Sequence, residues 1–368
     1  MMSLLHNSNG LRAPTRSYIN VISLISLTQI FMMMIACDDE RLFESEQIHV
    51  DHDQPEISGK ADGDHAINFG DDTQAPKDCT FDADDLYEPR SRFQKGPSIG
   101  ECHDTQSKRP VGFVDDDLAE AYQGLEDHYA LYNVFHNGDF WIAFVPHHSV
   151  KHVYFQLEYF PAVVPAGHAQ LRIEYDQPIM LYGQSTHVQG QIDQTHNLAL
   201  SIEAVTPVGG EYDLFKGARD HFAIAYRVTT MEARFQSMIV DQDHHVEQWR
   251  LNLTPDESEA ILPHYVSVSS THLLSFSYHT LFKNCTTEII EVLDGIGEYS
   301  WREQVQRFVV KVTEIYPNIV RAALIARGLL PLDQSTDWYP LEEDEEFIEQ
   351  MYRDDDELDL KSSAQRAP

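Results

Sequence analysis

The chain has 368 residues, of which 60 are Asp or Glu and 26 are Lys or Arg, so its formal net charge at neutral pH is −34. Such a surface repels the phosphate backbone of nucleic acids, which argues against a nucleic-acid-binding protein. It repels anionic lipid headgroups as well, so any membrane attachment must depend on something other than surface charge.

The first 36 residues have the pattern of an export signal. They contain no acidic residue, carry Arg12 and Arg16, and continue in a mostly apolar run over 18–36. Polar residues interrupt this run, whereas a transmembrane helix needs about 20 nearly uniform apolar residues, so a cleaved signal is the better interpretation.

Cys37 follows this apolar run directly. The segment Met34-Ile35-Ala36-Cys37 resembles a lipobox, although Met34 stands where Leu is usual. The resemblance implies that Cys37 is diacylated and becomes the mature N-terminus, so that acyl chains hold the protein to a lipid bilayer. The alternative is a plain cleaved signal followed by an incidental Cys.

The next segment, 37–78, is predicted to be a disordered acidic tether. Residues 38–78 hold 13 acidic and 3 basic residues and few large apolar ones. Cys79 and Cys102 then flank a stretch rich in Pro, Gly and charged residues. Because export implies an oxidising compartment, we expect these two to form a disulfide, which leaves Cys285 unpaired.

Residues 79–336 are predicted to form a single domain with strands first and helices later. Runs of β-branched and aromatic residues predict strands at 140–146, 153–160, 169–175 and 198–205, with weaker candidates at 221–228 and 233–240. Thr254 followed by Pro255 and two acids predicts a helix start, and a second helix is expected from about Asn284 to Gly295. Another lies within 305–327, broken at Pro317. This order favours an α+β fold with a mostly antiparallel sheet packed with helices.

The C-terminal segment 337–368 is again acidic, with 12 acids and 3 bases. We expect a solvated tail, part of which can dock through its aromatic residues. Calcium binding by the Asp clusters at 115–117 and 354–356 is an alternative, but these clusters lack the glycine and terminal glutamate of a calcium-binding loop.

Cys285 is the strongest candidate for chemistry. Asn284 is a favoured N-cap, which would place Cys285 in the first turn of a helix, where the positive end of the helix dipole favours a thiolate. A thiolate nucleophile needs a base, usually His, oriented by a third polar group. The chain has 19 His residues, so spacing alone selects none of them.

Residues from about 145 to 332 resemble the Lnb N-terminal periplasmic domain family of exported bacterial proteins. Matching pieces occur in the family's order at 166–173 (with the small-His-x-x-Leu pattern at Gly167-His168), 198–204, 211–213, 216–217, 249–255 and 278–287. The family in turn resembles circularly permuted papain-like cysteine hydrolases, among them NlpC-type enzymes and lecithin:retinol acyltransferase, in which the His strand precedes the Cys helix.

The resemblance implies roles for individual residues. Cys285 would be the nucleophile, His168 the base and Glu203 the group that orients the imidazole, while Asn284 or the Cys285 backbone N–H would stabilise an oxyanion. It implies no cofactor and no metal.

Each of these residues also has a structural interpretation. Cys285 could be an inert buried helix residue, and Glu203 could face water, because Ile202 and Ala204 make the opposite strand face apolar. A zinc site at His147, His148 and His152 is a further alternative. On a strand, however, His148 and His152 would lie about 13 Å apart, too far to share one metal ion.

Two functions follow from this sequence. The first is a cell-envelope lipoprotein, facing the periplasm, with a thiol hydrolase or acyltransferase site for an amide, ester or thioester in a peptide, peptidoglycan or lipid. The second is a non-catalytic envelope lipoprotein that keeps the fold for binding.

Overall fold

A computed structural model describes residue 79 and residues 85–115, 127–160, 167–280, 282–297, 317–331 and 338–351. By its internal contacts the chain divides into Met1–Gly63 and Asp64–Pro368, and the first unit lies wholly outside the described residues. The predicted signal, the lipid attachment at Cys37 and the tether 37–78 lie outside them too. Within the described ranges, no helix is long and apolar enough to cross a membrane.

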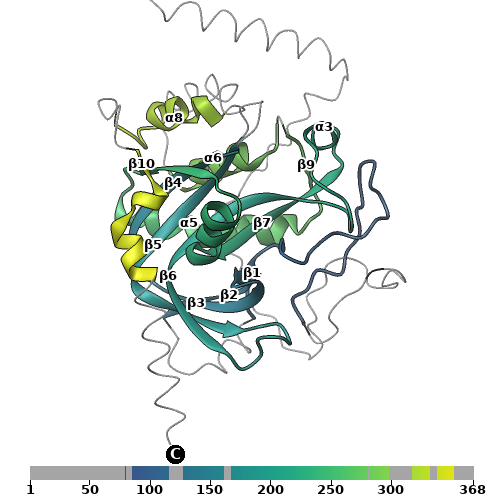
Figure 1. Ribbon diagram of the computed structural model, residues 1–368, viewed down its shortest axis with the longest axis horizontal. Coiled ribbons are helices and arrows are strands. Elements are labelled where there is room, and N and C mark those ends of the chain that lie inside the picture. The colour runs from purple at the N-terminus through teal and green to yellow at the C-terminus, as the bar shows by residue number, and fades with distance from the viewer. Residues whose placement is uncertain are drawn as a thin grey trace, which may run out of the picture. The chain divides into compact units, whose positions relative to one another are not determined.

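Ten strands form one sheet, which the ribbon in Figure 1 shows curving around the centre of the domain. They are β1 (Gly112–Phe113), β2 (His128–His136), β3 (Asp139–Pro146), β4 (Val150–Tyr159), β5 (Gly167–Gly183), β6 (Ile192–Val205), β7 (Phe222–Thr230), β8 (His245–Arg250), β9 (Ser277–Tyr278) and β10 (Tyr339–Pro340). The main path runs β1-β2-β7-β6-β5-β4-β8-β10, while β3 pairs with both β2 and β5.

The expected fold class is wrong in two respects. The sheet is mixed, because β2 and β7 pair in parallel, and five strands, β2, β7, β6, β5 and β3, close into a barrel instead of forming an open antiparallel sheet packed with helices. Closure depends on β5, whose first half pairs with β4 and whose second half, after an irregularity between Glu174 and Ile179, pairs with β3. A sequence pattern marks a strand but not a change of partner along it.

The described helices are α3 (Leu214–Gly217), α4 (Met231–Phe235), α5 (Pro255–His272), α6 (Cys285–Ile296) and α8 (Pro317–Ala326), with a π-helix at Gln236–Asp241 and a 3₁₀ helix at Leu341–Glu343. The predicted start of α5 is confirmed, because the Thr254 hydroxyl accepts the Glu257 N–H and the Glu257 carboxylate accepts the Thr254 N–H. The predicted strand at 233–240 is wrong. These residues belong to α4 and the π-helix instead, and the Thr230 side chain caps the start of α4 where β7 ends.

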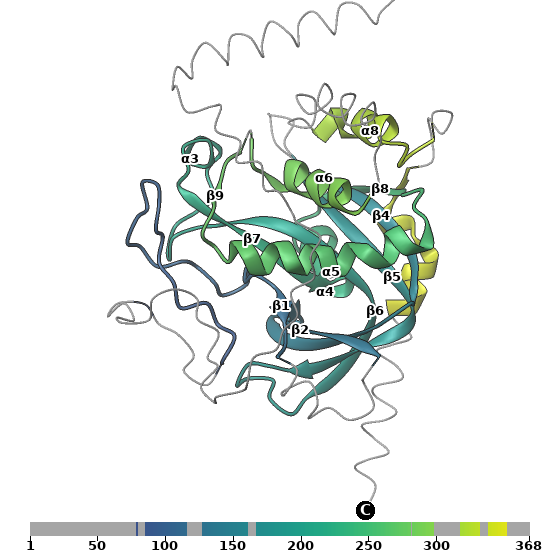
Figure 2. The ribbon, with the colours of Figure 1, turned by 180° about the vertical axis from the view of Figure 1, so that it is seen from behind.

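The two faces of the sheet differ in chemistry. Leu171, Leu200 and Val228 lie on an apolar face within the main core, which α5 and α6 cover, as Figure 2 shows. The alternate positions on the opposite face are polar but also buried, among them Gln156, Gln170, Arg172, Ser201 and Gln248.

Part of the C-terminal segment belongs to the fold. Its strand β10 pairs with β8, and Phe347 is buried. Asp344 accepts hydrogen bonds from the buried Arg172, at 2.5 Å, and from Gln248, at 3.0 Å. Residues 338–351 therefore cover the polar face instead of extending into solvent.

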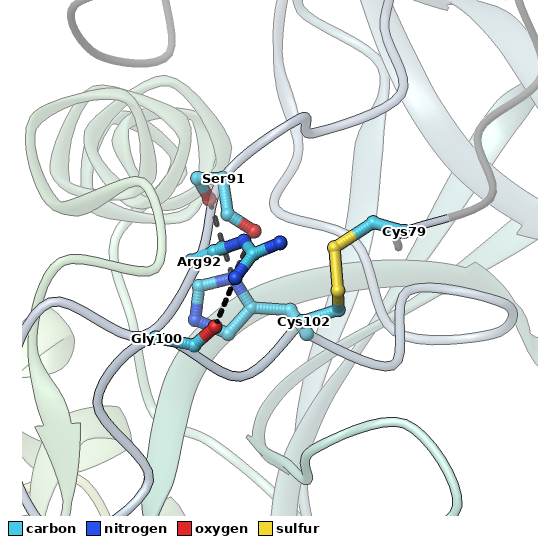
Figure 3. The surroundings of a disulfide bond; sticks show 6 residues. Cys79, Ser91, Arg92, Gly100 and Cys102 are labelled. Atoms are coloured by element: carbon cyan, nitrogen blue, oxygen red, sulfur yellow. Dashed lines mark hydrogen bonds between the residues drawn. A yellow bond between two sulfur atoms is a disulfide. The ribbon is translucent and has the colours of Figure 1, made fainter. Parts of the chain in front are cut away.

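The predicted disulfide between Cys79 and Cys102 is confirmed, with the two Cα atoms 5.9 Å apart (Figure 3). Cys102 forms an isolated β-bridge with Arg92, whose guanidinium donates to the Gly100 carbonyl at 2.7 Å. The disulfide thus joins Cys79 to a hydrogen-bonded loop.

Candidate functional site

Cys285 is the first residue of α6, as the sequence predicted. The Asn284 side-chain oxygen accepts the backbone N–H groups of Thr286 and Thr287 at 2.9 and 3.0 Å, and its amide nitrogen donates to the Thr280 carbonyl at 2.7 Å. Both polar atoms of the Asn284 amide are therefore engaged in starting the helix. The geometry gives Asn284 the task of positioning Cys285, and one of its two amide N–H groups is used on the Thr280 carbonyl; its role as an oxyanion donor stays a prediction.

His168 is the second residue of β5, and it is brought to Cys285 by the packing of α6 against β5 and β6. The imidazole and the thiol are near enough to shift each other's pKa. The backbone N–H of Ala169, the next residue of β5, also lowers the pKa of the Cys285 thiol. The sulfur thus has a ring nitrogen and a backbone donor beside it.

Glu203 lies beside His168 because of the register between β5 and β6. Gln170 pairs with Ser201, and extending this antiparallel register by two residues places His168 opposite Glu203. Glu203 Oε1 lies 3.4 Å from His168 Nε2, an ion-pair distance, and it also accepts a hydrogen bond from the Ser201 hydroxyl at 3.0 Å. The pair is not aligned for a hydrogen bond, because His168 Nε2 has no such partner among the described residues.

The sequence left open whether Glu203 faces water. In the structure, the Glu203 side chain does not face water. Ile202 and Ala204 lie in the apolar core, and Glu203 points to the opposite face, which is itself buried, so only 13% of its side chain is exposed. Three cations surround it: Lys108 Nζ at 4.0 Å from Oε2, with Arg227 Nη1 and Arg234 Nη1 each at 3.9 Å from Oε1.

The three groups have shifted pKa values that agree with this arrangement. Burial raises the pKa of the Cys285 thiol, but the charge and hydrogen bond of His168 and the Ala169 N–H outweigh it, so the pKa lies below that of an ordinary thiol. Burial lowers the pKa of His168, but Glu203 and Cys285 raise it above its ordinary value. Burial raises the pKa of Glu203, yet His168 and the three cations bring it well below that of an ordinary glutamate. A thiolate–imidazolium pair beside an ionised carboxylate is therefore favoured.

Two tyrosines belong to the site, and the sequence analysis gave neither of them a role. The Tyr278 hydroxyl lies near the Cys285 backbone N–H, and the Tyr212 hydroxyl lies near Tyr278 and 3.4 Å from Thr280 Oγ1. Tyr278 begins the segment that ends in the Cys helix, but its place beside Cys285 depends on the pairing of β9 with β7. No pattern in the sequence indicates this pairing of β9 with β7.

The site is nearly closed, since Cys285 is 5% exposed and His168 8% exposed. Residues 161–166, which precede β5, and Leu281 lie outside the described residues. The histidines of the alternative zinc site do not gather around a metal position: His147 packs on Tyr129, with ring centroids 4.1 Å apart. In the parts of the chain that are described, no three His, Cys, Asp or Glu side chains group as metal ligands.

Residues 138–317 match the family model of the Lnb N-terminal periplasmic domain. The matched segment contains His168, Glu203 and Cys285, and its family is periplasmic, which agrees with the predicted location outside the cytoplasm. No curated protein and no solved structure matches the chain at a significant level.

Proposed function

We propose that this protein is an envelope lipoprotein whose Cys285 catalyses hydrolysis or transfer of an acyl group. The observation that carries the proposal is the Glu203 carboxylate 3.4 Å from the His168 ring, with the Cys285 thiol near enough that the thiol and the imidazole shift each other's pKa. A thiol at a helix start, with a base and a carboxylate beyond the base, is the arrangement that activates a cysteine nucleophile.

The reaction follows from these groups. The Cys285 thiolate attacks the carbonyl carbon of an amide, ester or thioester, and the carbonyl oxygen becomes an oxyanion. The His168 imidazolium gives its proton to the leaving group as the C–N, C–O or C–S bond breaks, which leaves an acyl-enzyme. Water or another nucleophile, deprotonated by the now neutral His168, attacks the thioester and releases Cys285. Glu203 stays ionised throughout and stabilises the imidazolium.

The backbone N–H of Cys285 is the donor that would stabilise the oxyanion. In the free protein the Tyr278 hydroxyl lies near this N–H. A substrate oxygen that approaches the N–H therefore also comes close to Tyr278, whose hydroxyl can donate to the oxyanion.

The lipid anchor at Cys37 is part of the proposal. The match to a periplasmic domain family supports export, and the lipobox-like Met34-Ile35-Ala36-Cys37 supports acylation. Acyl chains on Cys37 would hold the domain at the bilayer, within reach of peptide, peptidoglycan or lipid substrates of the envelope.

One observation favours a non-catalytic binding protein instead. Cys285 is only 5% exposed, which is the environment of an inert core cysteine. The two functions differ in whether the Cys285 sulfur of the folded protein reacts with an electrophile.

The test is labelling of the folded protein with an acyl-directed activity-based probe and with iodoacetamide over a range of pH. Cys285 is the only free cysteine among the described residues, and mass spectrometry of its peptide reports on it alone. We expect labelling in the wild type at neutral pH, none in Cys285→Ala, and a strongly slowed rate in His168→Gln. Labelling that occurs only after denaturation, or that follows the pH dependence of an ordinary thiol, would establish the binding role.

A further inference from the structure

Three cations besides His168 lie around Glu203, and one of them, Arg234, also pairs with Glu158 at 3.2 Å. Lys108, Arg227 and Arg234 all lie within 4.0 Å of Glu203. Burying an arginine is costly unless its charge is compensated, and Arg227 and Arg234 are both largely buried. Burial and the neighbouring Arg234 lower the pKa of Arg227 to about 10, even though Glu203 opposes that shift.

Arg234 differs from the other two in how firmly it is held. It lies on α4, which starts directly after β7, and reaches across the polar face of the sheet. Its Nε donates to Gln170 Oε1 at 2.9 Å and its Nη2 to Glu158 Oε2 at 3.2 Å, so both its neighbours are fixed strand residues. The remaining nitrogen, Nη1, faces Glu203 at 3.9 Å.

The other two cations are less directed. Lys108 is 34% exposed and donates to the Ala204 carbonyl. Arg227 lies over the Phe135 ring, with the guanidinium carbon 4.6 Å from the centroid, and its Nε has no hydrogen-bond partner in the described parts of the chain.

We propose that Arg234 is a positioning residue for the reaction at Cys285, whose guanidinium, itself held by Gln170 and Glu158, holds the Glu203 carboxylate in front of His168. The inference rests on the proposed function. It adds one residue to the series of interacting side chains, which then runs from Cys285 through His168 and Glu203 to Arg234. Arg234 itself contacts neither Cys285 nor a substrate.

This arrangement has a consequence for the base. An unbalanced buried carboxylate would make the imidazolium too stable to give up its proton, whereas acid–base catalysis needs a group that both takes and releases a proton near the working pH. The positive charge of Arg234 opposes the charge on His168 and lowers the pKa of the imidazole, against the larger effect of Glu203. Arg234 thus fixes the carboxylate and moderates its effect at the same time.

The direction in which the His168 pKa shifts when Arg234 is removed depends on the other charged and titratable groups that act on Glu203 or His168. They are Lys108 before β1, Arg227 on β7, Tyr265 on α5, Tyr278 on β9 and Cys285 on α6. With Arg234 removed, Lys108, Arg227 and His168 still keep Glu203 ionised at neutral pH. His168 should then hold its proton to higher pH.

The experiment compares Arg234→Gln and Arg234→Lys with the wild type. The control is Arg109→Gln, which removes a different buried arginine, one that pairs with Asp85 and Glu88. One readout is the ultraviolet absorbance of the Cys285 thiolate against pH, with Cys285→Ala as the blank, because it does not require access to the sulfur. The other is the pH profile of the probe-labelling rate.

We expect Arg234→Gln to move the alkaline limb of the probe-labelling profile, which follows loss of the His168 proton, to higher pH and Arg109→Gln to leave it in place. The thiolate absorbance shows only that the native sulfur is ionised. Arg234→Lys keeps the charge but loses the bonds to Gln170 and Glu158, so it should keep the wild-type limb and lose about tenfold in labelling rate. A folded Arg234→Gln protein with the wild-type profile would overturn the inference. If that variant does not fold, wild-type labelling by Arg234→Lys would overturn it.

The two proposals fail in different ways. No native thiolate signal in the wild type refutes both the proposed function and this inference. A clear wild-type thiolate signal together with a labelling profile that Arg234→Gln leaves unshifted refutes only the role of Arg234.

Discussion

Glu203→Gln is the substitution that tests the electrostatics of the site most directly, and it requires no knowledge of the substrate. The amide fills nearly the same volume as the carboxylate, so the change removes a charge with little change in packing. Three cations and the His168 ring then lose the anion that all of them face.

The expected loss is about 2 to 3 kcal/mol in the free energy of unfolding at neutral pH. Removing one member of a fully buried ion pair costs roughly 3 to 5 kcal/mol. The loss expected for Glu203→Gln is smaller than that for a fully buried pair, because Arg227 and Arg234 lie 3.9 Å from the carboxylate and Lys108 is partly exposed.

The pH dependence gives the estimate a second check. Because the pKa of folded Glu203 lies below the ordinary value of 4.5, its contribution is fully present above that value and is lost as the pH falls through the folded pKa. The stability difference between wild type and Glu203→Gln should therefore be largest at neutral pH and shrink in acid.

The assay is urea unfolding of the two proteins between neutral pH and pH about 3, with linear extrapolation to water. Replacement of the exposed Glu211 by Gln is the control and should change stability by less than about 0.5 kcal/mol. Equal stability of wild type and Glu203→Gln at neutral pH would refute the reasoning, and so would a difference that grows in acid.

Three further predictions concern other parts of the chain. Replacing both Cys79 and Cys102 by Ser opens a loop with a sequence separation of 23 and should cost about 3 kcal/mol in thermal or urea unfolding; unchanged stability would show that the loop needs no cross-link. Thr254→Ala removes the N-cap of α5 and should cost about 1 kcal/mol, with Ser258→Ala, one turn into the helix, as the control; equal losses in the two would argue against the cap. Cys37→Ser should leave a protein without acyl chains that moves from the detergent to the aqueous phase, and identical partitioning and mass of mutant and wild type would rule out the lipid anchor.

The sequence predicted several local features of the fold correctly, although not the helical residues 233–240. β-branched and aromatic runs marked β3, β4 and parts of β5, β6 and β7, and the Thr254-Pro255 and Asn284-Cys285 junctions marked the starts of α5 and α6. These features depend on neighbours in the chain, because a cap or a strand pattern is satisfied within a few residues. The Cys79–Cys102 pair followed from the cysteine count and the expected compartment.

The fold class could not be predicted in this way. β2 and β8 carry weaker patterns and were missed, and it is β2 that closes the barrel through its parallel pairing with β7. Nor does the pattern of β5 indicate that its two halves pair with different strands. Such closure is a property of long-range register, which many strand sequences of similar composition satisfy equally well.

For the candidate site, the sequence determined where the thiol stands, at the capped start of a helix, and the family resemblance selected His168 and Glu203 from many histidines and acids. Only the tertiary structure decided that these three side chains meet, because His168 faces Glu203 through the register of β5 with β6 and Cys285 through the packing of α6. It alone placed Arg227, Arg234 and Tyr278 around them. Charges and hydroxyls that act across a sheet face come from segments far apart in the chain, so nothing in the local sequence records their neighbours.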